Sequence, residues 1–515
     1  MPTFSSIVFG CRANQADTAA LEQDLTRRGF QAAGPSAAAD FVVLNSCTVT
    51  AAADAELRQT IRRIHRDNPA ARILVTGCYA QRRPAELAAL PGVEWVVGNS
   101  HKTEIPRLLD QCDSRSSDSF VPVGRFLSGE SPSIDSDMRR LGSITPWDDS
   151  SAAPVKAFIL VGDISQQRQM VSAPHFGGAV EDRTRPNLKI QDGCNNRCSF
   201  CIIPAVRGFS RSLPVAGVLD QVRSLVAAGY REVVLSGVNL GQYGRDLHPS
   251  RAQQQAVAGT PAAQPLPHGL PRPAVGRGSD RLVQLIRTIL DETSVERLRL
   301  SSVEPMDFTD RLLDLMASTP RIARHVHAPL QSGSDSVLRR MHRKYRAGQY
   351  RERMLAAHER MPEAAFGADV IVGFPGETDD DFEATRRLIQ DLPFTYLHVF
   401  PFSRRPDTPA DQMKNQVNGS IARERGRILR ELVAEKHRRF RERHVGSTMR
   451  VLTLGASGSE DTLALSDNYL KVVLFGAPLS ANQWVEAHIH SVTEAGLAAR
   501  SVSEAQADSP ASARR

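Results

Sequence analysis

Short apolar runs recur through the first hundred residues, and polar stretches with helical spacing separate them. The runs SSIVFGC, FVVLNSC and RILVTGC occupy residues 5–11, 41–47 and 72–78. Between the first two runs, Asp17 is placed to cap a helix that Gly29 can end. Strands that alternate with amphipathic helices are typical of a parallel sheet. We therefore expect an open parallel α/β domain over residues 1–112.

Each of these three runs ends in a cysteine. Cys47 follows Cys11 by 36 residues and Cys78 follows Cys47 by 31, close to the ~30 residues of one strand–helix repeat. The carboxyl ends of parallel strands lie at one edge of a sheet, where ligands bind. Cys11, Cys47 and Cys78 can therefore lie close together, and we call them the N-terminal trio. Burial as a small apolar side chain accounts for each cysteine singly, but not for their shared position in the repeat.

The strand–helix rhythm returns after residue 183. Six further runs with strand character occupy residues 188–191, 232–241, 297–305, 325–334, 367–377 and 395–403. Most of them precede an amphipathic stretch, such as SVLRRMHRKY at residues 336–345. Six units are fewer than the eight of a complete barrel. The pattern predicts a partial (β/α)6 TIM-like barrel over residues 183–436, with its distinctive motifs at the carboxyl ends of the strands.

Two segments lack this pattern. Residues 113–182 are rich in serine, aspartate and proline, and we interpret them as a partly disordered linker in which residues 156–164 can form a strand. Residues 248–280 are rich in proline, alanine and glutamine. We expect this second segment to be a disordered loop insertion in the central domain.

The C-terminal part begins with a basic helix at residues 421–444. Residues 421–450 contain ten lysines or arginines and four glutamates, and a helix of mixed charge is usually a solvated face. Alternating short runs then predict a small antiparallel β-barrel over residues 437–500. We expect the tail, residues 501–515, to be disordered.

Composition adds little to this organisation. The 515 residues carry a formal net charge of +7, which suits a polyanionic partner but also an ordinary basic enzyme. Seven cysteines are an odd number, which argues against a disulfide framework, and we interpret Cys112 as a buried apolar side chain. Apolar stretches stay well below the ~20 residues of a bilayer span, and the start lacks a secretory signal. We expect a cytoplasmic protein with no membrane partner.

The loop QDGCNNRCSFCIIPAVRG, residues 191–208, contains the most specific chemistry. Cys194, Cys198 and Cys201, the central trio, offer three thiolates with no fourth cysteine nearby. A structural zinc site closes with four ligands, so zinc would need a distant histidine or cysteine. A [4Fe–4S] cluster on three thiolates leaves one iron open. That iron can chelate the amino and carboxylate groups of S-adenosylmethionine (SAM) and reduce its sulfonium, which gives a 5′-deoxyadenosyl radical.

These motifs resemble a known family. The central trio, with Phe200 before its last cysteine, is similar to the radical-SAM signature. FGCRANQADTAALEQDL, LNSCTVTAAADAELRQTIRR and LVTGCYAQRRP resemble the N-terminal domain of the methylthiotransferases. DGCNNRCSFCIIPAVRGFSRS, LSGVNLGQYGRD, LQSGSDSVLRRMHRKY and DVIVGFPGETDDDF resemble their radical-SAM domain, and the C-terminal barrel resembles the RNA-binding TRAM domain. The resemblance leaves out the linker, the insertion and the tail.

The resemblance implies SAM and two [4Fe–4S] clusters as cofactors. By this match the N-terminal trio holds an auxiliary cluster whose open iron carries the sulfur to be delivered. The central trio is the catalytic one, because it holds the cluster that binds SAM. One SAM molecule methylates the sulfur and a second makes the radical.

The resemblance also implies SAM contacts from residues near strand ends. These are Ser236, Gly237, Asn239, Glu304, Gln331, Gly373, Gly376 and Glu377. Each of them can instead stabilise the local fold by hydrogen bonding or by forming a turn. Arg207 and Arg211 can neutralise a SAM carboxylate or a phosphate, or they can be ordinary surface charges.

A TRAM-like barrel implies tRNA as the partner, contacted at the anticodon stem-loop. The residues expected to contact RNA are Arg438, Arg439, Arg441, Arg443, Tyr469 and Lys471. Tyr469 can stack on a base or belong to the barrel core. The resemblance further implies an electron donor such as flavodoxin or ferredoxin, and a sulfur donor that the sequence does not identify.

The residues within several motifs resemble the family branch that acts on threonylcarbamoyladenosine. The deciding stretches are GCRANQADT, NSCTVTAAAD, LSSVEP and HVFPFSRRPDTPADQM. The implied reaction is insertion of a methylthio group at C2 of N6-threonylcarbamoyladenosine-37 in tRNA. Two alternatives stay open: the isopentenyladenosine-37 branch, and a tRNA-binding protein without sulfur-transfer activity. The N-terminal trio disfavours a radical-SAM enzyme that transfers no sulfur.

Overall fold

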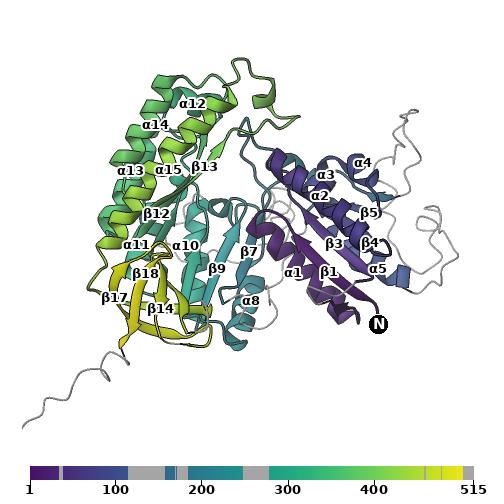
Figure 1. The fold of residues 1–515 in the computed structure, drawn as a ribbon, viewed down its shortest axis with the longest axis horizontal. Helices are drawn as coiled ribbons and strands as arrows, with labels where there is room; N and C mark the ends of the chain where they lie inside the picture. The colour runs from purple at the N-terminus through teal and green to yellow at the C-terminus, as the bar shows by residue number, and fades with distance from the viewer. Residues whose placement is uncertain are drawn as a thin grey trace, which may run out of the picture.

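The computed structural model describes residues 1–33, 39–113, 157–168, 170, 184–247, 278–456, 460–476 and 478–502. Almost all of the predicted insertion and tail, and most of the predicted linker, lie outside these residues. Within the described chain no helix combines the length and the apolar character that a bilayer span requires. Figure 1 shows an N-terminal α/β body beside a central body, with a small barrel below the latter.

The N-terminal body is a parallel sheet of order β2-β1-β3-β4-β5-β6. Its strands are β1 Thr3–Val8, β2 Gln31–Ala32, β3 Phe41–Ser46, β4 Arg72–Gly77, β5 Val93–Gly98 and β6 Phe158–Leu160. Its helices are α1 Arg12–Arg27, α2 Ala51–Asp67, α3 Cys78–Arg82, α4 Pro84–Ala88, η1 Asn99–Glu104 and α5 Ile105–Asp113. Helices cover both faces, α2 on one and α1 with α5 on the other, so β3 is buried throughout. The predicted open parallel α/β domain is confirmed.

Two details of this body differ from the sequence-based expectation. Strand β6 comes from the predicted linker and pairs with β5, so the sheet extends beyond residue 112. A three-residue strand is too short for its pattern to assign it to a sheet. Asp17 does not cap a helix, because α1 begins directly after Cys11 and Asp17 lies buried inside it.

The central body is the predicted partial barrel. Six parallel strands lie where the runs predicted them: β7 Asn187–Asp192, β9 Glu232–Gly237, β10 Arg297–Leu300, β11 His325–His327, β12 Ala365–Val372 and β13 Tyr396–Pro401. The sheets β10-β9-β7-β8 and β11-β12-β13 meet where Leu298 pairs with the segment before β11, and β8 Arg211–Ser212 adds an antiparallel edge. The helices are α7 Ile203–Arg207, α8 Val215–Ala227, α10 Gly278–Glu292, α11 Asp310–Ser318, α12 Asp335–Arg340, α13 Ala347–Arg360, α14 Asp379–Asp391 and α15 Gly419–Glu442. Short 3-10 turns are η3 Ile164–Gln166, η4 Leu240–Gln242, η5 Pro305–Asp307 and η6 Pro409–Gln412.

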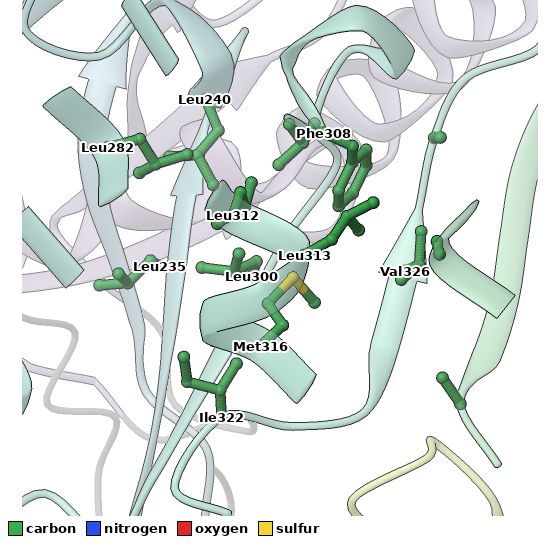
Figure 2. Close-up of a cluster of buried hydrophobic side chains, with 14 of the residues drawn as sticks. Leu235, Leu240, Leu282, Leu300, Phe308, Leu312, Leu313, Met316, Ile322 and Val326 are labelled. Carbon is green, nitrogen blue, oxygen red and sulfur yellow. The ribbon is translucent and has the colours of Figure 1, made fainter. Parts of the chain in front are cut away.

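The two faces of the barrel strands differ in chemistry. Alternate residues such as Leu235 and Leu300 point outward and pack on Leu282 and Leu312 of the surrounding helices (Figure 2). The residues between them are largely polar and face the barrel interior. This two-residue alternation creates an apolar layer under the helices and leaves a polar interior for chemistry.

Replacement of a large side chain in this apolar layer by alanine is expected to destabilise the folded protein. Leu312 on α11 is fully buried, so Leu312→Ala removes apolar contacts and leaves a cavity. We expect a loss of about 2–5 kcal/mol in the free energy of unfolding, measured by urea denaturation. Leu355→Ala on α13 is the matched control, because Leu355 is 42% exposed. Equal effects of the two substitutions would contradict the assignment of this layer as the core.

The C-terminal body is a closed barrel of order β14-β15-β16-β18-β17 that follows α15. Its strands are β14 Thr448–Ala456, β15 Thr462–Ser466, β16 Lys471–Leu474, β17 Trp484–Val492 and β18 Leu497–Ser501. The predicted barrel is confirmed, but its β16–β18 pair is parallel. An odd number of strands cannot alternate in direction around a closed ring, so one parallel pair is unavoidable. Helix α15 runs through the predicted boundary between residues 436 and 437.

Candidate functional site

The N-terminal trio converges at the carboxyl edge of its sheet. Cys11 precedes α1, Cys47 follows β3, and Cys78 begins α3 directly after β4. Gly10 has a φ of +87°, and a Cβ atom added there would lie 2.7 Å from Cys47 Sγ. A glycine is therefore required for the chain before Cys11 to come this close to Cys47. Cys11 is exposed, whereas Cys47 and Cys78 are buried.

The central trio lies in the loop after β7, and polar groups point at its sulfurs. Cys194 Sγ accepts from the Asn196 backbone N–H at 3.4 Å and faces Asn239 Nδ2 at 3.7 Å. Cys198 Sγ accepts from Arg343 at 3.3 Å. Donors directed at sulfur stabilise thiolates and metal-bound sulfur. The loop is thus arranged to present three sulfurs together.

All six thiols are free, and their surroundings fit metal clusters. Burial raises the pKa of Cys47 and of Cys201 to about 12. A thiol with so high a pKa keeps its proton unless a metal displaces it. Each trio supplies three ligands in one place, which suits a [4Fe–4S] cluster with one open iron.

The two trios belong to one region of the molecule. Cys78 packs against Ile202 and Val206, and Ile202 directly follows Cys201 in the chain. Asn99 joins the two bodies here, because its Nδ2 donates to the Val206 carbonyl at 2.8 Å and lies 3.6 Å from Cys78 Sγ. Cys78 of the N-terminal body thus lies beside the segment that directly follows the cysteine loop of the central body.

A buried network of charges holds this junction. Asp17 of α1 pairs with Lys102 at 2.8 Å, with Arg207 at 3.1 Å and with Lys189 of β7. Asp192 pairs with Arg207 at 2.8 Å and with Lys189 at 3.1 Å. Burial alone would raise the pKa of Asp17, but the surrounding cations hold it well below its usual value. Arg207 is therefore a structural link between the bodies and not the surface or SAM-facing charge that its position suggested.

Two of the residues predicted to contact SAM, Asn239 and Glu304, lie beside the central trio. The Oδ1 atom of Asn239 is buried and has no hydrogen-bond partner within the described chain, so it is available to a ligand. Glu304 accepts from Arg343, the residue that also donates to Cys198. Gln331 has a φ of 62° and is held by backbone hydrogen bonds to β12. Arg343 was missed by the sequence analysis, although it lies within the quoted RRMHRKY stretch.

The other predicted SAM contacts lie at strand ends or in the turn after β12, where they also stabilise the local fold. Ser236 is buried with its Oγ 3.5 Å from the Leu188 carbonyl, and Gly237 leaves room for Gln191. In the turn after β12, Glu377 accepts from the Gly373 N–H at 2.7 Å and from Arg425 at 2.6 Å. The adjacent Gly376 carbonyl accepts from Arg340 at 2.9 Å. Glu377 thus has a structural role that ties this turn to α15.

The arginines predicted to contact RNA are largely paired within the protein. Arg438 and Arg439 bind Glu435 on α15, Arg443 binds Glu363 at 3.0 Å, and Arg441 donates to a backbone carbonyl at 2.8 Å. They follow the pattern of a solvated helix face, which the sequence analysis left open. Lys471, by contrast, is exposed on the C-terminal barrel.

Tyr469, predicted to contact RNA or to belong to the barrel core, is partly buried between the two barrels. Its ring lies 4.7 Å from that of His325 and 5.8 Å from that of Tyr396, at the base of the central barrel. The Arg299 guanidinium lies 5.4 Å from the ring. Tyr469 therefore joins the two barrels, a role that local sequence cannot distinguish from base stacking.

Comparison with known proteins adds independent findings. Residues 3–98 match the family described as uncharacterized protein family UPF0004, and residues 188–389 match the radical SAM superfamily. The chain is 33% identical over 466 residues to the threonylcarbamoyladenosine tRNA methylthiotransferase MtaB of Aquifex aeolicus, which covers 90% of this chain and 94% of that protein. It is 31% identical over 463 residues to the tRNA-2-methylthio-N(6)-dimethylallyladenosine synthase of Thermobifida fusca. That alignment covers 89% of this chain and 79% of that protein. The radical S-adenosylmethionine methyltransferase TsrM from Kitasatospora setae aligns over 80% of this chain and 75% of its own, with 16% identity and a TM-score of 0.48.

Proposed function

The chain belongs to the radical-SAM methylthiotransferases, and from this premise we propose that it inserts a methylthio group at C2 of N6-threonylcarbamoyladenosine-37 in tRNA. It is a transferase that uses SAM and two [4Fe–4S] clusters. The observation that carries the proposal is the packing of Cys78 against the residues that follow Cys201, which brings two cysteine trios to one junction.

The reaction requires this pairing of sites. The C2–H bond of adenine is unactivated, so no side-chain base can remove its hydrogen. When bound, SAM and the cluster on the central trio supply the radical that removes it, and the cluster on the N-terminal trio supplies the sulfur. The radical and the sulfur act on the same carbon atom, so the two sites that supply them must lie close together. The buried junction between the N-terminal and central bodies supports this arrangement.

The chain's own residues position and shield this chemistry. Arg343 is 8% exposed and links Glu304 to Cys198, which orients both toward the same space. Asn239 lies beside Cys194 and offers a free oxygen to a ligand amino group. We assign SAM binding to Asn239 and Glu304, supported by their place beside the central trio.

Transfer RNA is the substrate, and we assign its contact to the anticodon stem-loop. Lys471 of the C-terminal barrel is an exposed cation that can contact phosphate. The paired arginines of α15 can exchange their glutamate partners for phosphates, because those pairs are exposed and weak. A small reducing protein such as flavodoxin or ferredoxin would supply the electrons.

Nucleoside mass spectrometry of tRNA from a deletion strain tests the substrate. We expect complete loss of the methylthio form of threonylcarbamoyladenosine, with accumulation of the unthiolated nucleoside. A plasmid with the wild-type gene should restore the product, and one with Cys194→Ala should not. Loss of only the methylthio isopentenyladenosine would contradict the proposal and assign the chain to the other branch.

A further inference from the structure

The inward face of β11, β12 and β13 contains a compact polar cluster that no role above explains. His327, Asp369 and His398 come from the three strands in turn, and one ligand atom of each lies within 4.8 Å of the others. His398 Nδ1 is 3.2 Å from Asp369 Oδ1, and His327 Nε2 is 3.6 Å from the same oxygen. Polar groups concentrated inside a barrel are typical of a ligand site.

His327 is the buried member of this cluster, and one of its two ring nitrogens lacks a hydrogen-bond partner among the described residues. Its side chain is 8% exposed, and its Nδ1 forms a 2.7 Å hydrogen bond with Ser302 Oγ. Its Nε2 has no hydrogen-bond partner within the described residues. A buried polar atom of this kind is costly unless a ligand satisfies it. Ser302 fixes the ring so that Nε2 faces the cluster.

Strand β13 leaves the cluster accessible from one side. It is an edge strand, and it is more exposed than a barrel strand normally is. His398 has a 55% exposed side chain, and Phe400, two residues further on the same face, is 45% exposed. An exposed aromatic ring next to hydrogen-bonding groups is the arrangement that receives an unstacked base.

The N-terminal body contributes a cation to this face. Arg12 directly follows Cys11, and its backbone carbonyl accepts from Asn187 Nδ2 at 2.8 Å at the start of β7. Its guanidinium has no hydrogen bond or ion pair to any described residue. Burial lowers the pKa of His327, Asp369 opposes this effect, and His398 and Arg12 add to it. The start of α1 thus lies against the start of β7, close enough for the charge of Arg12 to act on His327.

We propose that His327, Asp369, His398 and Arg12 bind the threonylcarbamoyl group of the tRNA substrate, with Phe400 stacking on its base. This inference rests on the proposed function. The substituent offers ureido N–H donors, a hydroxyl and a carboxylate. Asp369 accepts from the ureido group, and Arg12 pairs with the carboxylate while the histidines hydrogen-bond to the remaining oxygens.

The chemistry of the rival substrate argues for this assignment. An isopentenyl group has no polar atoms, so it would leave the buried Nε2 atom of His327 without a hydrogen-bond partner. The geometry of adenine agrees, because C2 and the N6 substituent lie on either side of N1. A base with C2 at the sulfur site therefore places its substituent nearby, and Arg12 lies next to Cys11.

The test compares two forms of one tRNA, with threonylcarbamoyladenosine or plain adenosine at position 37. For the reconstituted enzyme we expect at least ~10-fold tighter binding of the modified tRNA. His398→Gln and Asp369→Asn should each bring the ratio of the two dissociation constants close to one. His490→Gln is the matched control, an exposed histidine on β17 whose loss should leave the ratio unchanged. Iron content and circular dichroism verify that each variant is folded.

The outcomes separate the two proposals. A wild-type enzyme that makes the methylthio product, combined with unchanged ratios in both variants, would overturn the inference alone. A wild-type enzyme that makes no such product from the modified tRNA would overturn the proposed function and the inference with it. A stoichiometric divalent cation other than iron, lost in both variants while the binding ratio is unchanged, would assign the cluster to a metal and overturn substrate binding.

Discussion

Replacement of the N-terminal trio by alanine is expected to halve the iron content and abolish product formation. The wild-type chain should hold about eight iron atoms after anaerobic reconstitution, and the Cys11, Cys47 and Cys78 triple variant about four. Formation of 5′-deoxyadenosine from SAM depends on the central trio, so it should continue. Methylthiolation of tRNA should fall below detection, because the sulfur site is gone. Iron assay, 5′-deoxyadenosine analysis and nucleoside mass spectrometry measure the three quantities.

Two further variants sharpen this result. Cys112→Ala changes the one cysteine that belongs to neither trio, so it should keep about eight iron atoms and full activity. The Cys194, Cys198 and Cys201 triple variant should lose both SAM cleavage and product. A wild-type chain with only about four iron atoms, and an N-terminal triple variant with the same iron content and the same product formation, would contradict the assignment of the N-terminal trio as the sulfur site.

Most of the architecture could be predicted because it depends on local periodicity. Each barrel strand places alternate apolar residues under the helices, as Leu298 and Leu300 do in β10, and this pattern is visible without a partner. The cysteine positions were informative for the same reason, since a parallel sheet brings equivalent strand ends together. Strand β6 was harder to place, because residues 156–164 show strand character but only the pairing with β5 assigns them to the N-terminal sheet.

The features that sequence reasoning missed depend on residues distant in the chain. Glu377 was predicted to contact a ligand, and the structure adds a partner that the linear pattern does not show, because Arg425 of α15 binds its carboxylate. Asp17 looked like a helix cap, but cations from other elements surround it. From the sequence, a charged residue near a strand end or in a helix is expected to have a partner, but the sequence does not identify that partner. Only the packing of three bodies decides whether that partner is a ligand or the protein itself.

The charge network at the junction gives the second large prediction. Asp17→Asn keeps the size of the side chain but removes the negative charge that Lys102, Lys189 and Arg207 share. Asp17 is 2% exposed, so those cations would remain buried with too little compensation. We expect a loss of about 3–5 kcal/mol in the free energy of unfolding at neutral pH, measured by urea denaturation. Methylthiolation should fall as well, because the same contacts join the two trios.

Asp24→Asn is the matched control, since Asp24 lies on the same helix in an exposed pair with Arg28. This substitution should lower the free energy of unfolding by less than about 1 kcal/mol.

The effect of Asp17 also has a defined pH dependence. Its folded-state pKa lies below the unfolded value of about 3.9, so its stabilisation is complete above about pH 5 and declines as the pH falls below about 4. The difference in the free energy of unfolding between wild type and D17N should therefore become smaller at acidic pH. If the two free energies did not differ at neutral pH, the Asp17 ion pairs would not hold the junction, and contacts such as the packing of Cys78 and the Asn99 hydrogen bond would have to do so.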